Sequence, residues 1–159
     1  MNDNLRDPRL TLILEHYGEE HQRWKLVEEL GELSAELGRF RNGDRSNVAD
    51  LIHECADAIV VLTQLCSVIP ETDGWTTMDV RTRENVTDSL AQSIGSCLRF
   101  LSPMPASMWG KKEFVVVASI YDAIWELATF LGEVPMLYRA VHMKINRQIE
   151  RIEGEKNHG

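Results

Sequence analysis

The sequence predicts an all-α fold, an antiparallel helical bundle in a single domain of residues 1–159. Apolar residues recur at intervals of three and four over most of the chain, which is the period of one face of an α-helix. Proline, glycine and asparagine punctuate these segments, and none has the convincing alternation of a β-strand. A chain of 159 residues is long enough to bury a real core within one domain.

The first expected helix covers residues 8–17. It opens at Asp7-Pro8, where an N-cap residue is followed by proline at the first helical position, and Gly18 closes it. The second expected helix, residues 21–40, has an apolar stripe with spacings of four, three, four and three residues. This stripe consists of Leu26, Leu30, Leu33, Leu37 and Phe40.

Acidic residues lie beside the apolar stripe of the second helix. On a helical wheel Glu29, Glu32 and Glu36 lie about 60 to 120° to one side of it, and Glu28 lies a little further round. Glutamates on a helix more often form a solvated face, but a row so close to the apolar seam need not face bulk water. The other flank carries small residues, and there we expect a neighbouring helix to approach closely. These are Gly31, Ser34 and Gly38.

The third expected helix covers residues 47–69 and follows a short link. The pair Asn42-Gly43 ends the second helix, and Ser46 or Asn47 is the expected N-cap of the third. A link of this length predicts that the two helices form an antiparallel hairpin.

Glu54 and Asp57 lie one turn apart on the flank of the third helix. Folding the chain about the link brings them to nearly the same level as Glu32, with Glu28 and Glu29 one turn further along. Packed carboxylates repel by roughly 3 kcal/mol per pair at ~6 Å and an effective dielectric constant near 20, so cations are expected between them. A site with oxygen ligands only suits Mg²⁺ or Mn²⁺ better than zinc.

The rest of the chain predicts three further helices. Segment 70–74 contains proline and glycine and breaks the pattern, and residues 75–83 are left unassigned. The expected helices are 84–101, 112–131 and 135–151. A proline-rich loop follows the first of them, Gly132 stops the second, and Pro135 opens the last. We expect a charged, frayed tail after Gly154.

The two halves of the chain resemble one another. A shift of 60 residues aligns Leu30, Arg39 and Phe40 with Leu90, Arg99 and Phe100, and a shift of 65 aligns Asp57-Ala58-Ile59 with Asp122-Ala123-Ile124. Helices share such periods by chance, but the matches favour an internally duplicated helix-hairpin unit. Residues 1–70 would carry the acidic motifs, and residues 84–152 would contain a degenerate repeat and the C-terminal helix. We expect one metal site per chain, within a homodimer.

Two acidic motifs, EExxE and ExxD, are separated by 21 residues, and a lysine precedes the first by three residues. The residues are Lys25, Glu28, Glu29, Glu32, Glu54 and Asp57. This pattern resembles the MazG-like all-α nucleoside triphosphate pyrophosphohydrolases, and the likeness covers about residues 20–70. The resemblance implies Mg²⁺-dependent hydrolysis of an NTP or dNTP to the monophosphate and pyrophosphate, a reaction that cleans the nucleotide pool.

The resemblance also implies roles for single residues. Glu29, Glu32, Glu54 and Asp57 would bind one to three Mg²⁺ ions, which Mn²⁺ can replace. Glu28 and Glu29 would be catalytic, with Glu28 as a ligand or general base. Substrate contacts would come from the start of the second helix and from the basic last helix. The candidates are Trp24, Lys25, Lys144, Asn146 and Arg147.

Composition narrows the class of protein. The net charge of −8 and the lack of a basic patch argue against nucleic-acid binding. Three cysteines without a secretory signal predict reduced, buried thiols. The longest apolar run, near residues 58–69, is too short to span a membrane, so we expect a cytoplasmic protein without a membrane partner.

Two other classes of protein remain open. The chain can be a non-catalytic helical regulatory protein that holds a metal or nucleotide, although the full set of five acids argues against this. A di-iron carboxylate bundle is less favoured, because its Glu-x-x-His motif occurs here only in the tail, from Glu155 to His158.

Overall fold

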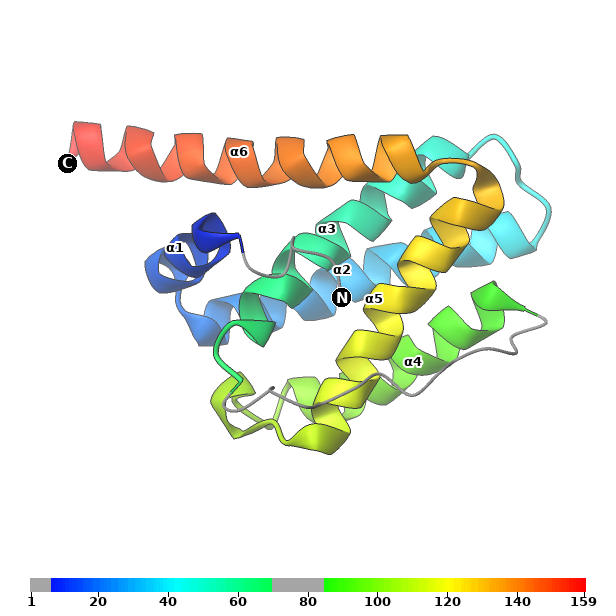
Figure 1. The fold of residues 1–159 in the computed structure, drawn as a ribbon, viewed down its shortest axis with the longest axis horizontal. Helices are drawn as coiled ribbons and strands as arrows, with labels where there is room; N and C mark the ends of the chain where they lie inside the picture. The colour runs from blue at the N-terminus through cyan, green and yellow to red at the C-terminus, as the bar shows by residue number, and fades with distance from the viewer. Residues whose placement is uncertain (1–6, 70–84) are drawn as a thin grey trace.

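The computed structural model describes residues 7–69 and 85–159, and these residues form helices and turns without a β-strand (Figure 1). The all-α class predicted from the sequence is therefore confirmed for the described part of the chain. Its elements are α1 (Pro8–Tyr17), α2 (Glu19–Arg41), α3 (Val48–Cys66), α4 (Val86–Leu101), the 3-10 turn η2 (Ala106–Met108), α5 (Lys111–Leu131) and α6 (Val134–His158).

Two antiparallel hairpins and a long last helix make up the fold. Figure 1 shows α2 and α3 joined by a short link, and α4 and α5 joined through the turn that contains η2. The hairpins contact one another through α2 and α4 and through α3 and α5. Helix α6 lies along α3 and also packs against α1 and α5. Helix α3 is thus covered by α2 on one side and α6 on another.

The ends of the first three helices follow the expected signals closely. Asp7 caps α1 by accepting a 3.0 Å hydrogen bond from the backbone N–H of Arg9, and Gly18 ends it with φ 86°. Helix α2 runs slightly beyond the expected residues 21–40 at both ends. Helix α3 ends at Cys66 rather than at residue 69, because the backbone of Ser67 to Ile69 makes i to i+3 hydrogen bonds instead of continuing the helix.

The C-terminal half agrees with the expected helices except at its end. Helix α4 starts at Val86 with Asn85 as its side-chain cap, whereas the expected start at residue 84 and the break at 70–83 lie outside the described residues. Gly132 ends α5 in a left-handed conformation, with φ 72°. The expectation of a frayed tail after Gly154 is wrong, since α6 continues to His158.

A long-range contact within the chain holds the end of the last helix against α1. The Nε2 atom of His16 on α1 lies 2.8 Å from Oε2 of Glu155, and Ile152, one turn earlier, is buried. Sequence periodicity cannot show such a partner, because α1 and the end of α6 are 139 positions apart.

The core contains the expected apolar stripes. Every member of the α2 stripe from Leu26 to Phe40 is buried. The apolar residues of α3 from Leu51 to Leu65 are also buried. Cys55 and Cys97 are buried as expected, while Cys66 is half-buried, and all three thiols are free. Burial raises the pKa of the Cys66 and Cys97 thiols to about 12, so neither is a reactive thiolate at neutral pH.

The small-residue flank of α2 does not have the expected role. Helix α4 lies on this side, where Ser34 and Gly38 line a cavity of about 180 Å³ together with Thr87 and Ala91. A Cβ atom added at Gly31 or Gly38 would meet no atom within 4 Å. The prediction that these residues allow a close helix approach is therefore wrong for contacts among the described residues.

The longest apolar helix is α5. By length and composition alone it is the one described helix that is able to cross a membrane, and half of its apolar window is buried. A core helix of a soluble protein passes the same test, so this is weak evidence for a membrane span.

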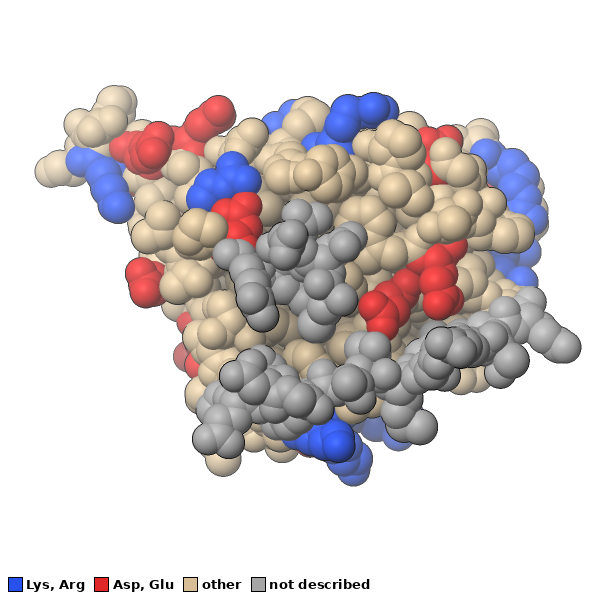
Figure 2. All heavy atoms as spheres, viewed as in Figure 1, with Lys and Arg blue, Asp and Glu red and all other residues tan. Residues whose placement is uncertain are grey.

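Figure 2 shows acidic and basic side chains scattered over one face of the molecule, with Lys and Arg mostly near its margin.

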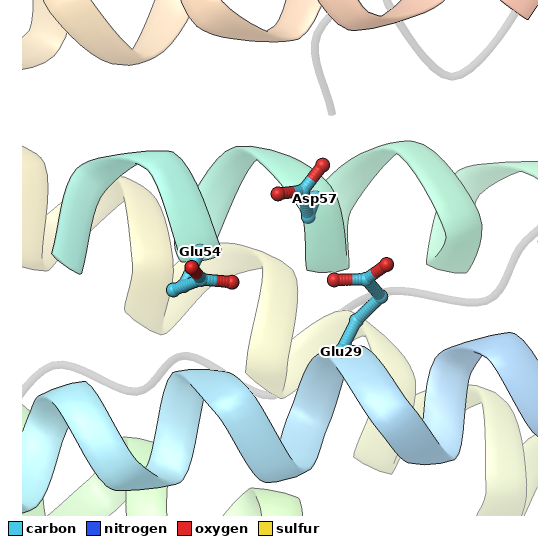
Figure 3. Close-up of side chains that lie close together, drawn as sticks. All are labelled: Glu29, Glu54 and Asp57. Atoms are coloured by element: carbon cyan, nitrogen blue, oxygen red, sulfur yellow. The ribbon is translucent and has the colours of Figure 1, made fainter. Parts of the chain in front are cut away.

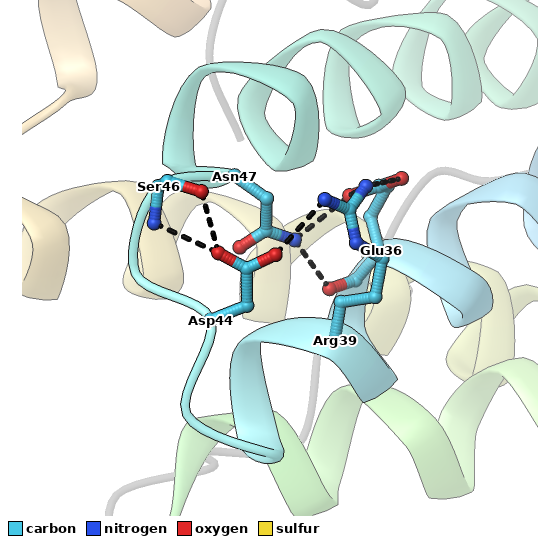
Figure 4. Close-up of polar contacts among 5 residues, drawn as sticks. All are labelled: Glu36, Arg39, Asp44, Ser46 and Asn47. Carbon is cyan, nitrogen blue, oxygen red and sulfur yellow. Dashed lines mark hydrogen bonds and ion pairs between the residues drawn. The ribbon is translucent and has the colours of Figure 1, made fainter.

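A polar network fixes the corner between α2 and α3 (Figure 4). Asn47 is 1% exposed, and its Nδ2 donates hydrogen bonds to the backbone oxygen of Glu36 at 3.0 Å and to Oε2 of Glu36 at 2.7 Å. Arg39 bridges Glu36 and Asp44, and Asp44 accepts hydrogen bonds from the backbone and hydroxyl of Ser46. Asn47 thus ties the start of α3 to the last turns of α2 instead of acting as a side-chain cap.

Replacing Asn47 with alanine is expected to lower the free energy of unfolding by about 1–3 kcal/mol, because the buried side chain and its two hydrogen bonds to Glu36 are lost. Urea unfolding followed by circular dichroism measures this change. Ser46→Ala is the matched control, since its exposed hydrogen bond should cost less than about 0.5 kcal/mol. Equal losses of stability from the two changes would mean that the buried hydrogen bonds of Asn47 contribute no more than the exposed hydrogen bond of Ser46.

Candidate metal site

Three carboxylates come together between α2 and α3. Glu29 projects from α2 and Glu54 and Asp57 project from α3 (Figure 3), and each offers an oxygen atom such that all three atoms lie within 4.8 Å of one another. Glu29 is 4% exposed, whereas Glu54 and Asp57 are half-buried. This is the one group of three or more candidate metal-ligating side chains among residues 7–69 and 85–159.

The helical hairpin explains why these three residues meet. Glu54 and Asp57 are three residues apart, so they share one face of α3. The short link sets α2 antiparallel to α3, which brings Glu29 opposite Asp57. Leu26, Leu30 and Leu33, buried around Glu29, hold this part of α2 against α3. The acids therefore occupy the edge of the apolar seam, as the wheel predicts.

Two lysines neutralise part of this negative charge. On α2, Nζ of Lys25 lies 2.8 Å from Oε1 of Glu29 and 3.0 Å from Oε1 of Glu28. On α6, Nζ of Lys144 forms an ion pair with Oδ2 of Asp57. The site is thus built from three helices, because α6 supplies the second cation.

Two oxygen atoms of the cluster receive no hydrogen bond from residues 7–69 and 85–159. Oε2 of Glu29 and Oε2 of Glu54 are buried without a hydrogen-bond partner among the described residues. A buried, unpaired carboxylate oxygen is costly unless a cation or a proton meets it. Oxygen-only donors at this spacing fit Mg²⁺ or Mn²⁺, so Glu29, Glu54 and Asp57 are residues that can hold such an ion.

The electrostatics of the cluster favour uptake of positive charge. Burial, together with the charges of Asp57, Glu32 and Glu29, raises the pKa of Glu54 to about 7, while Lys144 opposes this shift. Burial also raises the pKa of Glu29, with Lys25 opposing the shift. Burial alone would lower the pKa of Lys25, but its hydrogen bonds to Glu29 and Glu28 raise it well above the usual range. Both glutamates thus bind a proton more readily than ordinary carboxyls.

The other predicted acids lie outside this three-residue group. Glu32 lies one turn from Glu29 on the same side of α2 but is exposed, and its charge raises the pKa of Glu29 and Glu54. Glu28 is exposed and paired with Lys25. Glu36, which shares the row on the wheel, is held by Arg39 and Asn47 instead.

The predicted substrate contacts are only partly gathered at the cluster. Lys25 and Lys144 are within it, but Asn146 accepts a hydrogen bond from Nη1 of Arg9 and thus faces α1. Arg147 is exposed on α6, and Trp24 is 54% exposed on α2 rather than part of the core. Helix periodicity separates Lys144 from Asn146 by about 200°, so both cannot face α3.

Sequence reasoning missed a set of buried glutamines beyond the acids. Gln22 lies seven residues before Glu29, and Gln64 lies seven residues after Asp57, so each repeats the position of an acid two turns away. Both are buried, and each has a side-chain carbonyl oxygen without a hydrogen-bond partner among the residues that the structure describes. Nε2 of Gln64 donates to Gln148 on α6 at 3.2 Å. The sequence signal that could have identified these two glutamines is a polar residue at heptad spacing within an apolar stripe.

Stability in metal-free buffer is expected to fall as pH rises from about 5 to about 7. The raised pKa of Glu54 means that the folded chain binds its proton more tightly than the unfolded chain, so deprotonation in this window favours unfolding. Glu54→Gln should remove this loss and be more stable than the wild type at pH 8 by on the order of 1 kcal/mol, a figure discounted for the partial exposure of the group.

Urea unfolding with EDTA at pH 5 and pH 8 measures the difference, and Glu126→Gln, an exposed acid on α5, is the control. A parallel decline of wild type and Glu54→Gln with pH would show that Glu54 is not under electrostatic strain.

Comparisons of the chain with models of known protein families, with curated proteins and with solved structures found no match. The chemistry of the site is therefore argued from its own residues. Three clustered carboxylates, two of them with an unpartnered buried oxygen and a raised pKa, and two lysines at their edge form a centre suited to a divalent cation and a phosphate-bearing ligand.

Proposed function

We propose that the protein is a Mg²⁺-dependent nucleoside triphosphate pyrophosphohydrolase, which converts an NTP or dNTP to the monophosphate and pyrophosphate. The observation that carries this proposal is the carboxylate cluster of Glu29, Glu54 and Asp57, with a nearly fully buried Glu29 whose Oε2 has no hydrogen-bond partner in the described part of the chain. The EExxE and ExxD motifs, which resemble those of the MazG-like enzymes, supply the reaction class.

A bound divalent cation would neutralise charge on the phosphate oxygens and make a nearby water more acidic. Glu29, Glu54 and Asp57 hold the cation, with Glu32 close enough to add its charge. Glu28 is exposed beside Lys25 and is the proposed general base, accepting a proton from the attacking water. The water oxygen bonds to phosphorus, the α–β phosphoanhydride bond breaks, and pyrophosphate leaves with the electron pair.

Lysine side chains at the rim can orient the phosphates. Lys144 and Lys25 contact the acids directly, so their ammonium groups are already at the place where a metal-bound phosphate chain would lie. Arg147 lies one turn beyond Lys144 and is exposed. The single acidic centre beside basic groups is what a substrate with four negative charges requires.

The second hairpin is proposed to be a degenerate copy of the first. In support, the ends of α2 and α4 (residues 41 and 101) and of α3 and α5 (residues 66 and 131) differ by the shifts of 60 and 65 residues found in the sequence, although the helix starts differ by 67 and 63. Contacts between α2 and α4 and between α3 and α5 are those that a pseudo-two-fold axis would produce. The second hairpin then serves as the intramolecular partner of the first, within a cytoplasmic homodimer.

Purified protein with Mg²⁺ is expected to convert at least one member of a panel of NTPs and dNTPs to monophosphate and pyrophosphate, as measured by anion-exchange chromatography. EDTA should stop the reaction. Glu54→Gln should lower turnover by more than about a hundredfold, because loss of a direct ligand should exceed the effect of losing an outer-shell partner.

Release of diphosphate and orthophosphate would show that a different bond is cleaved. Nucleotide binding without any turnover would favour the regulatory protein that holds a nucleotide or metal, and absence of both would reject the proposal.

The duplication is tested by counting sites. Isothermal titration with a non-hydrolysable nucleotide and Mg²⁺ should give one nucleotide per chain. Asp122→Asn should leave turnover nearly unchanged, while Asp57→Asn at the matching position should abolish it, since only the first hairpin keeps the acids. Two nucleotides per chain, or a folded but inactive Asp122→Asn variant, would establish a working second site.

A further inference from the structure

The contact between Lys144 and Asp57 joins a cation to one of the three carboxylates that can hold a metal ion. The ammonium group of Lys144 on α6 contacts Asp57 on α3, whereas Lys25 and the Glu29 that it contacts both lie on α2. The lysine side chains are only 19% and 36% exposed, respectively, so both cations are partly withdrawn from water.

We infer that Lys144 is an internal counter-ion of the metal-free protein and that a divalent cation competes with it for Asp57. The inference rests on the proposed metal site but not on turnover. A carboxylate oxygen that accepts a hydrogen bond from an ammonium group is not fully available to a metal ion, and an ammonium beside a bound divalent cation is repelled by it. Cation binding therefore releases Lys144 from Asp57.

The two lysines differ in what their release changes. Lys25 is four residues from Glu29 on one helix, so its movement alters no contact between helices. Lys144 links α6 to α3. Its release frees a cationic side chain at the edge of the cluster, where a phosphate oxygen can replace the lost carboxylate. Metal binding thus prepares one phosphate contact, and we expect metal and nucleotide to bind with positive coupling through Lys144.

The remaining contacts of α6 show that this exchange is local. Gln148 bonds to Gln64 one turn further along, and Asn146 bonds to Arg9 on the side of α1. Ile145, next to Lys144 in the chain, is buried. These contacts do not involve the acids, so the helix keeps its place when the Lys144 side chain moves.

The test uses Mn²⁺ alone, with binding followed by titration calorimetry and by the electron paramagnetic resonance signal of the free ion. Lys144→Met should lower the melting temperature of the metal-free protein, because the acids lose a counter-ion. The same variant should bind Mn²⁺ about tenfold more tightly than the wild type, since it removes the competing cation. Lys144→Arg, which keeps the charge, should stay close to the wild type.

Arg151→Met is the control for charge, because Arg151 is exposed on α6 and lies seven residues after Lys144, about 10 Å away and mostly screened at physiological salt. Unchanged or weaker Mn²⁺ binding by Lys144→Met would overturn the inference, as would equal tightening by Arg151→Met. If the wild type itself binds no Mn²⁺, the proposed metal site fails together with the inference. If it binds Mn²⁺ but Lys144→Met does not bind more tightly, only the inference fails.

Discussion

Charge confined at the edge of an apolar seam is the constraint that shapes this protein. The hairpin of α2 and α3 buries leucines on both helices, and the same packing forces Glu29, Glu54 and Asp57 within 4.8 Å of one another. Three negative charges so close together oppose folding unless positive charge accompanies them. Lys25 and Lys144 supply part of it in the chain alone, and burial together with the neighbouring acids still raises the pKa of Glu54 to about 7.

This constraint links the carboxylate cluster to the helices around it. Helix α6 contributes a cation to the cluster as well as packing to α3, and the second hairpin covers other faces of α2 and α3 without adding acids. If packing were the only requirement, apolar residues at the positions of the three carboxylates would serve it better. The retention of buried, partly unpaired carboxylates instead is what favours a binding or catalytic role over a purely structural one.

Much of the fold could be predicted from the sequence because the signals are local. Asp7-Pro8, Gly18 and Gly132 mark helix ends by their own backbone preferences, and the stripe from Leu26 to Phe40 identifies the buried face of α2. The end of α6 could not be predicted in this way, since it depends on a contact between His16 and Glu155. The open space beside Gly31 and Gly38 depends on where α4 lies, which no residue of α2 encodes.

The candidate site shows the same division. Spacing alone placed Glu54 and Asp57 on one face. Folding about the link put Glu32 at their level and Glu29 one turn further along, whereas the structure brings Glu29 into the cluster. The surroundings of each glutamate in the acidic row distinguish the one that enters the cluster. Glu36 is bonded to Asn47 and Arg39, and Glu32 faces solvent. The partnership of Lys144 with Asp57 requires the packing of α6 on α3, and the unpaired oxygens of Gln22 and Gln64 are visible only in three dimensions.

The corner formed by Asn47, Glu36 and Arg39 has a consequence for how the chain can change over evolution. One residue inserted within α3 between this corner and Glu54 would rotate Glu54 and Asp57 by about 100° relative to the start of the helix. Glu54 and Asp57 would then leave the seam, even with every acid still present. The number of helical residues between this corner and the acids is therefore as much a part of the site as the carboxylates. A single insertion or deletion there would separate the acids and remove the site.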